Sequence, residues 1–194
     1  MPAIKKNSSR RQEILQCLAH MLETDIGARI TTARLAKEVG VSEAALYRHF
    51  PSKAKMYEGL LEFAEESIFS RITIIMSEHD DGIKRCQLIL GLLLGFASKN
   101  PGLCRLFVGD ALIGEQERLR ERVVQLFDRI ESQLKQVIRN YRMEQTRDHL
   151  DSAVLANAML AMAEGRIQQY VRSGFKRLPT EQWDAQWNYL ADKL

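Results

Sequence analysis

The sequence contains little that would cross-link the chain or hold it in a membrane. Among its 194 residues are three cysteines, Cys17, Cys86 and Cys104, an odd number at wide spacing that argues against a disulfide framework. The longest apolar run covers residues 89–97 and is far too short to span a bilayer. Residues 1–9 lack the apolar segment of a secretory signal. We therefore expect a cytoplasmic protein that does not engage a membrane.

The residue patterns of common catalytic sites are missing as well. The four histidines, His20, His49, His79 and His149, lie at no metal-ligand spacing from cysteines or carboxylates. No glycine-rich phosphate loop follows a strand, and no nucleophile elbow is present. The sequence thus predicts a protein that is not an enzyme and that carries no metal or cofactor.

What the sequence does contain is helical periodicity. Nearly every segment repeats its apolar residues every three or four positions, and none alternates like a strand between turn signals. We expect an all-α fold with an N-terminal domain at residues 9–70 and a larger helical domain at residues 71–194. Residues 79–82 and 143–148 are predicted to be loops. The helices are predicted at residues 9–22, 31–39, 43–49, 52–76, 83–98, 103–108, 115–141, 150–173 and 180–191.

Residues 31–50 have the pattern of a helix-turn-helix. Thr31 is a hydroxyl N-cap, and Gly40 suits the left-handed cap that ends a helix. Ser42 then caps a second helix, which Pro51 stops. In a DNA-binding helix-turn-helix this second helix, residues 43–49, enters the major groove.

The residue types on the second helix suit contact with DNA. Ala44 is small enough to allow close approach, and Arg48 can bind guanine or phosphate in a bidentate way. Tyr47 and His49 can donate to phosphate oxygens, as can the free N–H groups at helix N-termini. Lys53 begins the next helix and could close a phosphate clamp. The predicted DNA-binding residues are Thr31, Thr32, Ser42, Ala44, Tyr47, Arg48, His49 and Lys53.

The positive charge is concentrated in the same part of the chain. Residues 1–60 hold ten Lys or Arg and six Asp or Glu, whereas residues 61–194 hold eighteen and nineteen. The net charge of +3 is therefore a balance of +4 and −1. Such an excess is typical of a DNA-contacting domain, although small domains also vary by a few charges at random.

A known family contains a closely similar run of residues. Leu46-Tyr47-Arg48-His49-Phe50-Pro51-Ser52-Lys53 resembles the signature of the TetR family of bacterial DNA-binding regulators. The helix–glycine–helix spacing alone is equally typical of an ordinary helical hairpin, and this run favours the DNA-binding alternative. The resemblance implies a three-helix DNA-binding unit, a helical body and a dimer that reads palindromic sites.

The helices predicted at residues 115–141 and 150–173 offer a natural dimer surface. In the first, apolar residues at near-heptad spacing form a coiled-coil-like stripe, with Leu134 shifted by one. In the second, small residues such as Ala156 and Ala163 permit close helix packing. Two such helices from each subunit would make a four-helix bundle, so we expect a homodimer. The stripe consists of Leu119, Val123, Leu126, Ile130, Val137 and Tyr141.

Residues 10–193 are similar to one branch of the TetR family, the nucleoid occlusion factors. Specific matches lie outside the helix-turn-helix, at residues 92–96, 100–103, 127–131 and 171–176. The chain departs from that pattern at Lys99, where an arginine is expected, and in a connection between the first two helices that is one residue shorter. The resemblance implies a nucleoid-associated dimer that binds palindromic DNA, needs no small-molecule ligand and, when DNA-bound, antagonises FtsZ, the protein of the division ring.

The resemblance also implies that the C-terminal tail of FtsZ lies between the helices predicted at residues 52–76 and 83–98. Helical spacing places Phe63 and Arg71 on one face of the first helix, and Leu92, Gly95 and Lys99 on one face of the second. Arg71 and Lys99 would flank a groove that suits an acidic, apolar peptide. Periodicity alone favours Phe63, Leu92 and Phe96 as core residues, and only the resemblance reverses this. The predicted FtsZ-binding residues are Phe63, Arg71, Leu92, Gly95, Lys99 and Asn100.

The alternative is a repressor that responds to a small molecule. Such a protein needs convergent polar groups inside an apolar cavity. The candidates in the predicted body helices are Cys86, Gln87, Asn157 and Gln168. The sequence leaves this alternative open.

Overall fold

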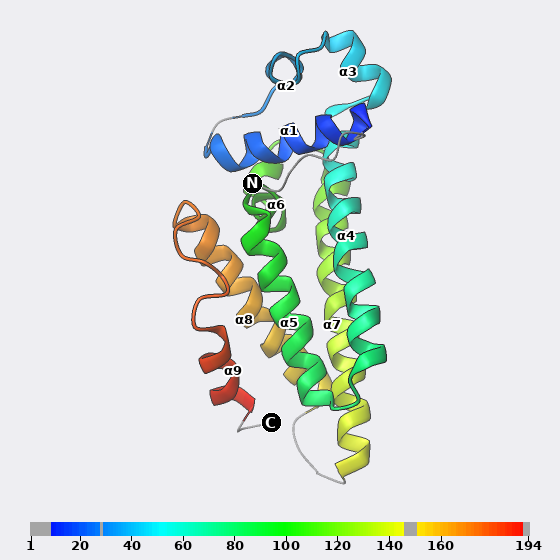
Figure 1. The fold of residues 1–194 in the computed structure, drawn as a ribbon, viewed down its shortest axis with the longest axis vertical. Coiled ribbons are helices and arrows are strands. Elements are labelled where there is room, and N and C mark those ends of the chain that lie inside the picture. Colours follow the sequence, from blue (N-terminus) through cyan, green and yellow to red (C-terminus); the bar gives the residue numbers. More distant parts are fainter. Residues whose placement is uncertain (1–8, 28, 146–150, 192–194) are drawn as a thin grey trace.

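The computed structural model describes residues 9–27, 29–145 and 151–191, and within these residues it contains helices and no strands. This confirms the all-α fold. Three helices lie at one end of an elongated molecule, and longer helices run side by side below them (Figure 1). The elements are α1 (Arg10–Thr24), α2 (Thr32–Val39), α3 (Glu43–His49), α4 (Lys53–Glu78), α5 (Gly82–Lys99), α6 (Pro101–Phe107), the 3₁₀ turn η1 (Asp110–Leu112), α7 (Glu117–Gln145), α8 (Ser152–Arg172) and α9 (Trp183–Ala191).

Side-chain hydroxyls start the four N-terminal helices, as the sequence indicates. Ser9 caps α1 in a reciprocal capping box with Gln12, while Thr31, Ser42 and Ser52 cap α2, α3 and α4. Each hydroxyl accepts a hydrogen bond from a backbone N–H of the first turn, which would otherwise lack a partner. Gly40 ends α2 at a φ of 75°, in the left-handed region that glycine adopts without strain.

The body is held together by apolar faces that α4, α5, α7 and α8 turn toward one another. Leu94 on α5, Ile130 on α7 and Ala163 on α8 are each 0% exposed. The C-terminal helix α9 packs on this body through Trp183 and Trp187, whose ring centroids lie 5.8 Å apart. In residues 9–27, 29–145 and 151–191, no helix has both the length and the apolar character that crossing a membrane requires.

Several predicted boundaries are wrong by one to four residues. Gly82 begins α5 instead of ending a loop, because the Asp81 carboxylate accepts hydrogen bonds from the first N–H groups of this helix. Residues 143–145 are helical and extend α7, whereas the rest of that predicted loop lies outside the described residues. The last helix begins at Trp183, after a turn at residues 179–182. The predicted domain boundary at residue 70 falls inside α4, which is continuous there, and it stays a prediction.

The apolar stripes assigned to the dimer surface are buried inside a single chain, so that part of the prediction is wrong, whereas the use of these two helices in a dimer stays a prediction. Ala156 is 0% exposed, and the heptad-like residues of α7 from Leu119 to Val137, Leu134 among them, are buried as well. These faces pack within the chain, so they are not available to a second copy. The outer face of α8 is free instead. Its small or apolar residues, at positions spaced by three or four, are Val154, Ala158, Ala161 and Gly165.

Candidate nucleic-acid interface and peptide groove

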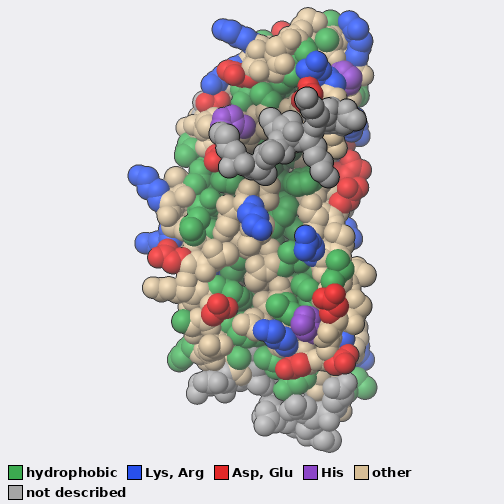
Figure 2. Space-filling model, in the orientation of Figure 1, with side chains coloured by type: hydrophobic (Ala, Val, Ile, Leu, Met, Phe, Trp, Pro, Cys, Tyr) green, Lys and Arg blue, Asp and Glu red, His purple; other side chains and the backbone are tan. Residues whose placement is uncertain are grey.

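The packing of α2 and α3 determines which side chains of the helix-turn-helix face outward. Leu35, Leu46 and Phe50 are buried beneath the motif, so the opposite side of α3 is directed to solvent. Tyr47 is 42% exposed, and Arg48 and His49 are exposed as well. Figure 2 shows Lys and Arg side chains at this end of the molecule, over α2 and α3. The second helix of the motif thus presents one aromatic and two basic side chains to a ligand.

Two of the predicted DNA-binding residues are hydrogen-bonded to each other. The Tyr47 hydroxyl lies 3.2 Å from Thr32 Oγ1, and Thr32 in turn donates to Glu43 Oε2 at 2.9 Å. These bonds join the start of α2 to both ends of α3. They hold the Tyr47 ring across the motif. In this position its hydroxyl can donate to a phosphate oxygen instead of to Thr32 Oγ1.

The far end of α3 is fixed by a residue outside the motif. Arg11 on α1 donates to the carbonyl oxygen of His49 at 3.1 Å, and its guanidinium lies 4.1 Å from the centroid of the Phe50 ring. A cation at a helix C-terminus is favourable because it faces the negative end of the helix dipole. Arg11 is not among the predicted residues, because its two partners lie far away in the sequence.

The remaining predicted DNA-binding residues differ in how accessible their side chains are. Thr31, Ser42 and Ala44 are exposed around the N-termini of α2 and α3. Lys53 is not free in the same way, because its Nζ pairs with Glu115 Oε1 at 2.6 Å and lies 5.3 Å from the centre of the Tyr57 ring. Burial, followed by the charge of Glu115, raises the pKa of the Tyr57 phenol. Lys53 would have to leave Glu115 before it could bind a phosphate.

A groove of about 460 Å³ lies between α4 and α5, with α9 closing one end. Arg71 and Leu92, two of the predicted FtsZ-binding residues, both line it. Its wall also contains Ile74, which is 46% exposed, and the indole of Trp183. Figure 2 shows hydrophobic side chains interspersed with basic and acidic ones over this part of the body.

The other predicted FtsZ-binding residues lie nearer the DNA-binding end of the same two helices. Phe63 is 48% exposed, and its ring centroid lies 6.1 Å from that of the buried Phe96. A Cβ atom added to Gly95 would have no neighbour within 4 Å, and Lys99 is exposed. Asn100 donates to the carbonyl oxygen of Phe96 at 2.8 Å. The interpretation of Phe63 as a core residue is therefore wrong, whereas Phe96 is core.

Most of the groove wall, including Ile74 and Trp183, is absent from the predicted FtsZ-binding residues. Ile74 follows Arg71 by three positions and so lies on the same side of α4, a signal that the sequence already held. Trp183 comes from α9, more than ninety residues after Leu92 along the chain, and no local pattern could have placed it there.

The four candidates for a small-molecule pocket are not brought together. Cys86 is buried beside a cavity of about 10 Å³, and Gln87 lines the α4–α5 groove. Asn157 and Gln168 are exposed on α8, where Asn157 donates to Glu131. These side chains do not converge on one cavity.

Comparison with known families divides the chain into two matching regions. Residues 22–60 match the family described as bacterial regulatory proteins of the tetR family. Residues 80–194 match an SlmA-like family described as the tetracyclin repressor-like C-terminal domain. The first region contains the helix-turn-helix, and the second contains α5 and most of the body.

Curated relatives match over nearly the whole chain. The nucleoid occlusion factor SlmA of Shewanella amazonensis is 60% identical over 193 residues, which cover 99% of this chain and 98% of the relative. The protein of the same name from Shewanella oneidensis is 59% identical over the same shares of the two chains.

Solved structures share the fold at low sequence identity. The fatty acid degradation regulator FadR from Bacillus halodurans has a TM-score of 0.81 at 14% identity, covering 96% of this chain and 97% of its own. The MbdR regulator from Azoarcus sp. CIB also has a TM-score of 0.81, at 19% identity, covering 96% and 99%. At such identities the likeness extends to the fold alone.

Proposed function

The chain belongs to the SlmA nucleoid occlusion factors of the TetR family, and we propose that it binds palindromic chromosomal DNA as a homodimer and, while bound, restrains FtsZ. Division septa would then not form over the nucleoid, with which the protein associates. The observation that most supports the FtsZ step is the groove between α4 and α5, whose wall combines apolar side chains with the basic Arg71 and Lys84 and the acidic Glu78 and Asp184.

The DNA step uses the outward side of α3. Arg48 can bind a guanine edge or a phosphate, and Tyr47 and His49 can donate to phosphates on either side. The exposed N-termini of α2 and α3 add backbone N–H groups near Thr31 and Ser42. The small Ala44 leaves room for the helix to approach the bases.

The homodimer uses the outer face of α8 that the single chain leaves exposed. Ala158, Ala161 and Gly165 allow two helices to approach closely, and Val154 supplies apolar area. A two-fold axis across this face would set two copies of α3 on the same side of the molecule, as reading two half-sites of a palindrome requires.

The FtsZ step uses the groove as a seat for the FtsZ C-terminal tail. Phe63 and Leu92 would contact apolar side chains of the tail, and Arg71 and Lys99 would attract its acidic groups. Gly95 leaves the surface of α5 open beyond the groove, toward the DNA-binding end, because a Cβ there would have no neighbour within 4 Å. Asn100 would bind main-chain groups at the end near α6.

The test combines DNA fragments that the protein itself selects from chromosomal DNA with purified FtsZ. Arg71→Asp reverses an exposed charge in the groove, and Lys176→Asp reverses an exposed charge outside it as a matched control. We expect both variants to bind the fragments like the parent protein, because neither change touches α2 or α3. Sedimentation of FtsZ polymers with DNA present should respond to the parent and to Lys176→Asp, and not to Arg71→Asp.

The outcomes separate the two steps of the proposal. An Arg71→Asp variant that restrains FtsZ as the parent does would remove the groove from the mechanism. A parent protein that selects no DNA fragment would contradict the DNA step. Release from DNA by a small metabolite, with no effect on FtsZ, would favour the ligand-responsive repressor instead.

A further inference from the structure

We propose that Arg105 on α6 is a positioning residue for DNA binding, supplied by the body to hold the helix-turn-helix in its orientation. Arg105 is only 5% exposed and is the one charged residue buried to this degree in the described part of the chain. A buried guanidinium is stable only when its N–H groups have partners. The identity of those partners carries the inference.

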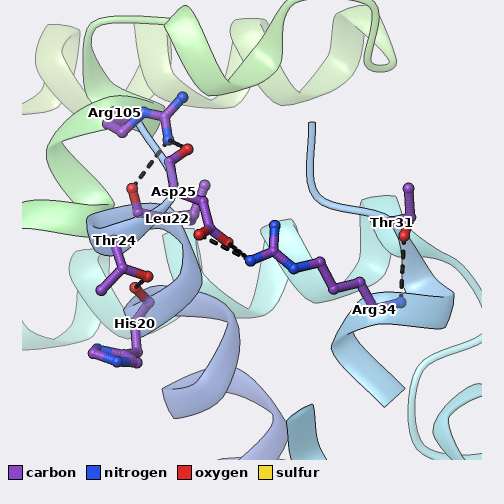
Figure 3. A network of polar contacts seen from close by, with 7 residues as sticks. All are labelled: His20, Leu22, Thr24, Asp25, Thr31, Arg34 and Arg105. Carbon is purple, nitrogen blue, oxygen red and sulfur yellow. Dashed lines mark hydrogen bonds and ion pairs between the residues drawn. The ribbon is translucent and has the colours of Figure 1, made fainter. Parts of the chain in front are cut away.

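The guanidinium of Arg105 binds the end of α1 rather than another part of the body. Its Nη1 donates to the carbonyl oxygens of Leu22 at 3.0 Å and Asp25 at 3.1 Å, which lie at the C-terminus of that helix (Figure 3). Its Nε donates to the carboxylate of Asp110 at 3.0 Å. Carbonyls at the end of a helix lack intrahelical partners, so Arg105 satisfies groups that α1 itself cannot.

Asp25 links Arg105 to the helix-turn-helix. While its carbonyl accepts from Arg105, its carboxylate pairs with Arg34 on α2, whose Nη2 lies 2.9 Å from each carboxylate oxygen (Figure 3). Asp25 thus joins a residue of the body to the first helix of the motif through two different groups. Arg34 is also fixed through its backbone, since its N–H donates to the Thr31 cap.

The packing between α1 and α6 leaves little room for adjustment at this junction. Gly102 lies against α1 so closely that an added Cβ would be 2.1 Å from the carbonyl oxygen of Ala19. Arg105 follows Gly102 by three residues and faces the same helix. The helix α6 therefore meets α1 at two points, one by close backbone contact and one by hydrogen bonds.

The same short helix also begins at a predicted FtsZ-binding residue. Asn100, a predicted FtsZ-binding residue, is the N-cap residue of α6 and accepts backbone hydrogen bonds from Leu103 and Cys104. A shift of α6 would consequently move both Asn100 and the contact with α1. In this respect the inference rests on the proposed function, whereas the positioning of α2 by Arg105 does not.

The experiment compares Arg105→Gln with Arg85→Gln in the full-length protein. Arg85 is a suitable control because its Nη2 also donates to a carbonyl at the end of a helix, that of Met76 at 2.8 Å, and it is largely buried. The first measurement is hydrogen exchange of backbone amides in residues 29–49. We expect Arg105→Gln to raise exchange there by roughly tenfold, since hydrogen bonds from a charged donor are lost, and Arg85→Gln to leave it unchanged.

The second measurement is affinity for the chromosomal fragments bound by the parent protein. We expect Arg105→Gln to weaken binding by roughly tenfold or more at a temperature where both variants remain folded, with the slope of affinity against salt unchanged, because Arg105 touches no phosphate. Arg105→Lys keeps the charge and part of the bonding and should restore part of the affinity. A variant with parental exchange in residues 29–49 would overturn the inference, whether or not DNA binds.

A third variant applies if Arg105→Gln fails to fold. Asp25→Asn removes the charge partner of Arg34 and keeps the carbonyl that Arg105 binds. Faster exchange in α2 with unchanged exchange in α6 would support the relay, and unchanged exchange in both would overturn it. If the parent protein bound no DNA, the proposed function would fail while the exchange measurement still decided this inference.

Discussion

Gly102 and Ala19 are in backbone contact across the junction between body and DNA-binding unit, at a place where a methyl group would lie 2.1 Å from a carbonyl oxygen. We predict that Gly102→Ala lowers the free energy of unfolding by about 1–3 kcal/mol, as overpacking typically does. Urea denaturation of Gly95→Ala supplies the comparison. That Cβ has no neighbour within 4 Å, so removing a helical glycine should stabilise by about 0.5–1 kcal/mol. Equal stabilities of the two variants would contradict the packing at Gly102.

A larger side chain at residue 95 tests the groove without disturbing the core. Gly95→Glu places a negative charge and added volume where an acidic, apolar peptide is proposed to lie. We expect a synthetic FtsZ tail peptide to bind this variant at least tenfold more weakly by isothermal titration, while the melting temperature stays near that of the parent. Unchanged peptide affinity would show that the tail lies elsewhere.

Charged substitutions on the two faces of α8 are expected to have different effects, one on folding and the other on dimerisation. Ala156 is 0% exposed within one chain, so Ala156→Asp should unfold the protein, because an unpaired buried charge destabilises by about 3–5 kcal/mol. Ala161 is exposed, and Ala161→Glu should leave the fold intact and dissociate the dimer in sedimentation velocity runs. An Ala161→Glu protein that is still dimeric at low micromolar concentration would exclude this face as the interface.

Glu164 makes the free energy of unfolding depend on pH in a direction that can be predicted. Burial, followed by the nearby Glu131 and Asp128, raises the pKa of this carboxyl. A folded state that holds the proton more tightly than the unfolded one is destabilised when the carboxyl ionises. Glu164→Gln should therefore be slightly more stable than the parent at neutral pH, by up to about 0.5 kcal/mol, because Glu164 is only partly buried and solvent screens its charge. The difference should shrink as the pH falls through the raised pKa and disappear below the ordinary pKa of glutamate. A constant difference across that range would refute the assignment.

Because Glu115 holds Lys53 in an ion pair, we predict that removing the Glu115 charge strengthens DNA binding. Glu115→Gln removes the charge that holds Lys53, and the freed ammonium can then reach a phosphate. We expect the variant to bind DNA more tightly than the parent, with a steeper dependence on salt by about one unit of slope. Lys53→Gln should leave the slope as it is in the parent if the ion pair persists on DNA.

Most of the local structure was predictable because it depends on neighbours in the sequence. The caps at Thr31, Ser42 and Gly40 are short-range hydrogen bonds or backbone conformations, and each lies where the pattern places it. The all-α fold follows from apolar spacing in the same way. Errors at helix ends came from residues such as Asp81, whose side chain starts α5 earlier than apolar periodicity alone indicates.

What the sequence could not supply is the partner of each apolar face. The heptad-like stripe of α7 was assigned to a second copy, yet α7 uses it within its own chain. Periodicity indicates which residues share an apolar face, but not which helix or chain packs against that face. The same limit explains why periodicity alone favours Phe63 as a core residue. It also explains why the buried contacts of Arg105 with α1 were not predicted, since they join residues 80 or more positions apart.

Because α4 is long, a small rotation at its end near the helix-turn-helix would displace the residues at the groove by a large distance. The helix runs unbroken for 26 residues, about 39 Å at 1.5 Å per residue, and it begins directly after the reading helix. Arg71 lies about 27 Å along this rod from Lys53. A tilt of about 5° at the first turn would carry Arg71 through about 2 Å, by the same rise per residue. That displacement exceeds the tolerance of a hydrogen bond, so a rotation of this size at the first turn of α4 would change the contacts that Arg71 can make in the groove.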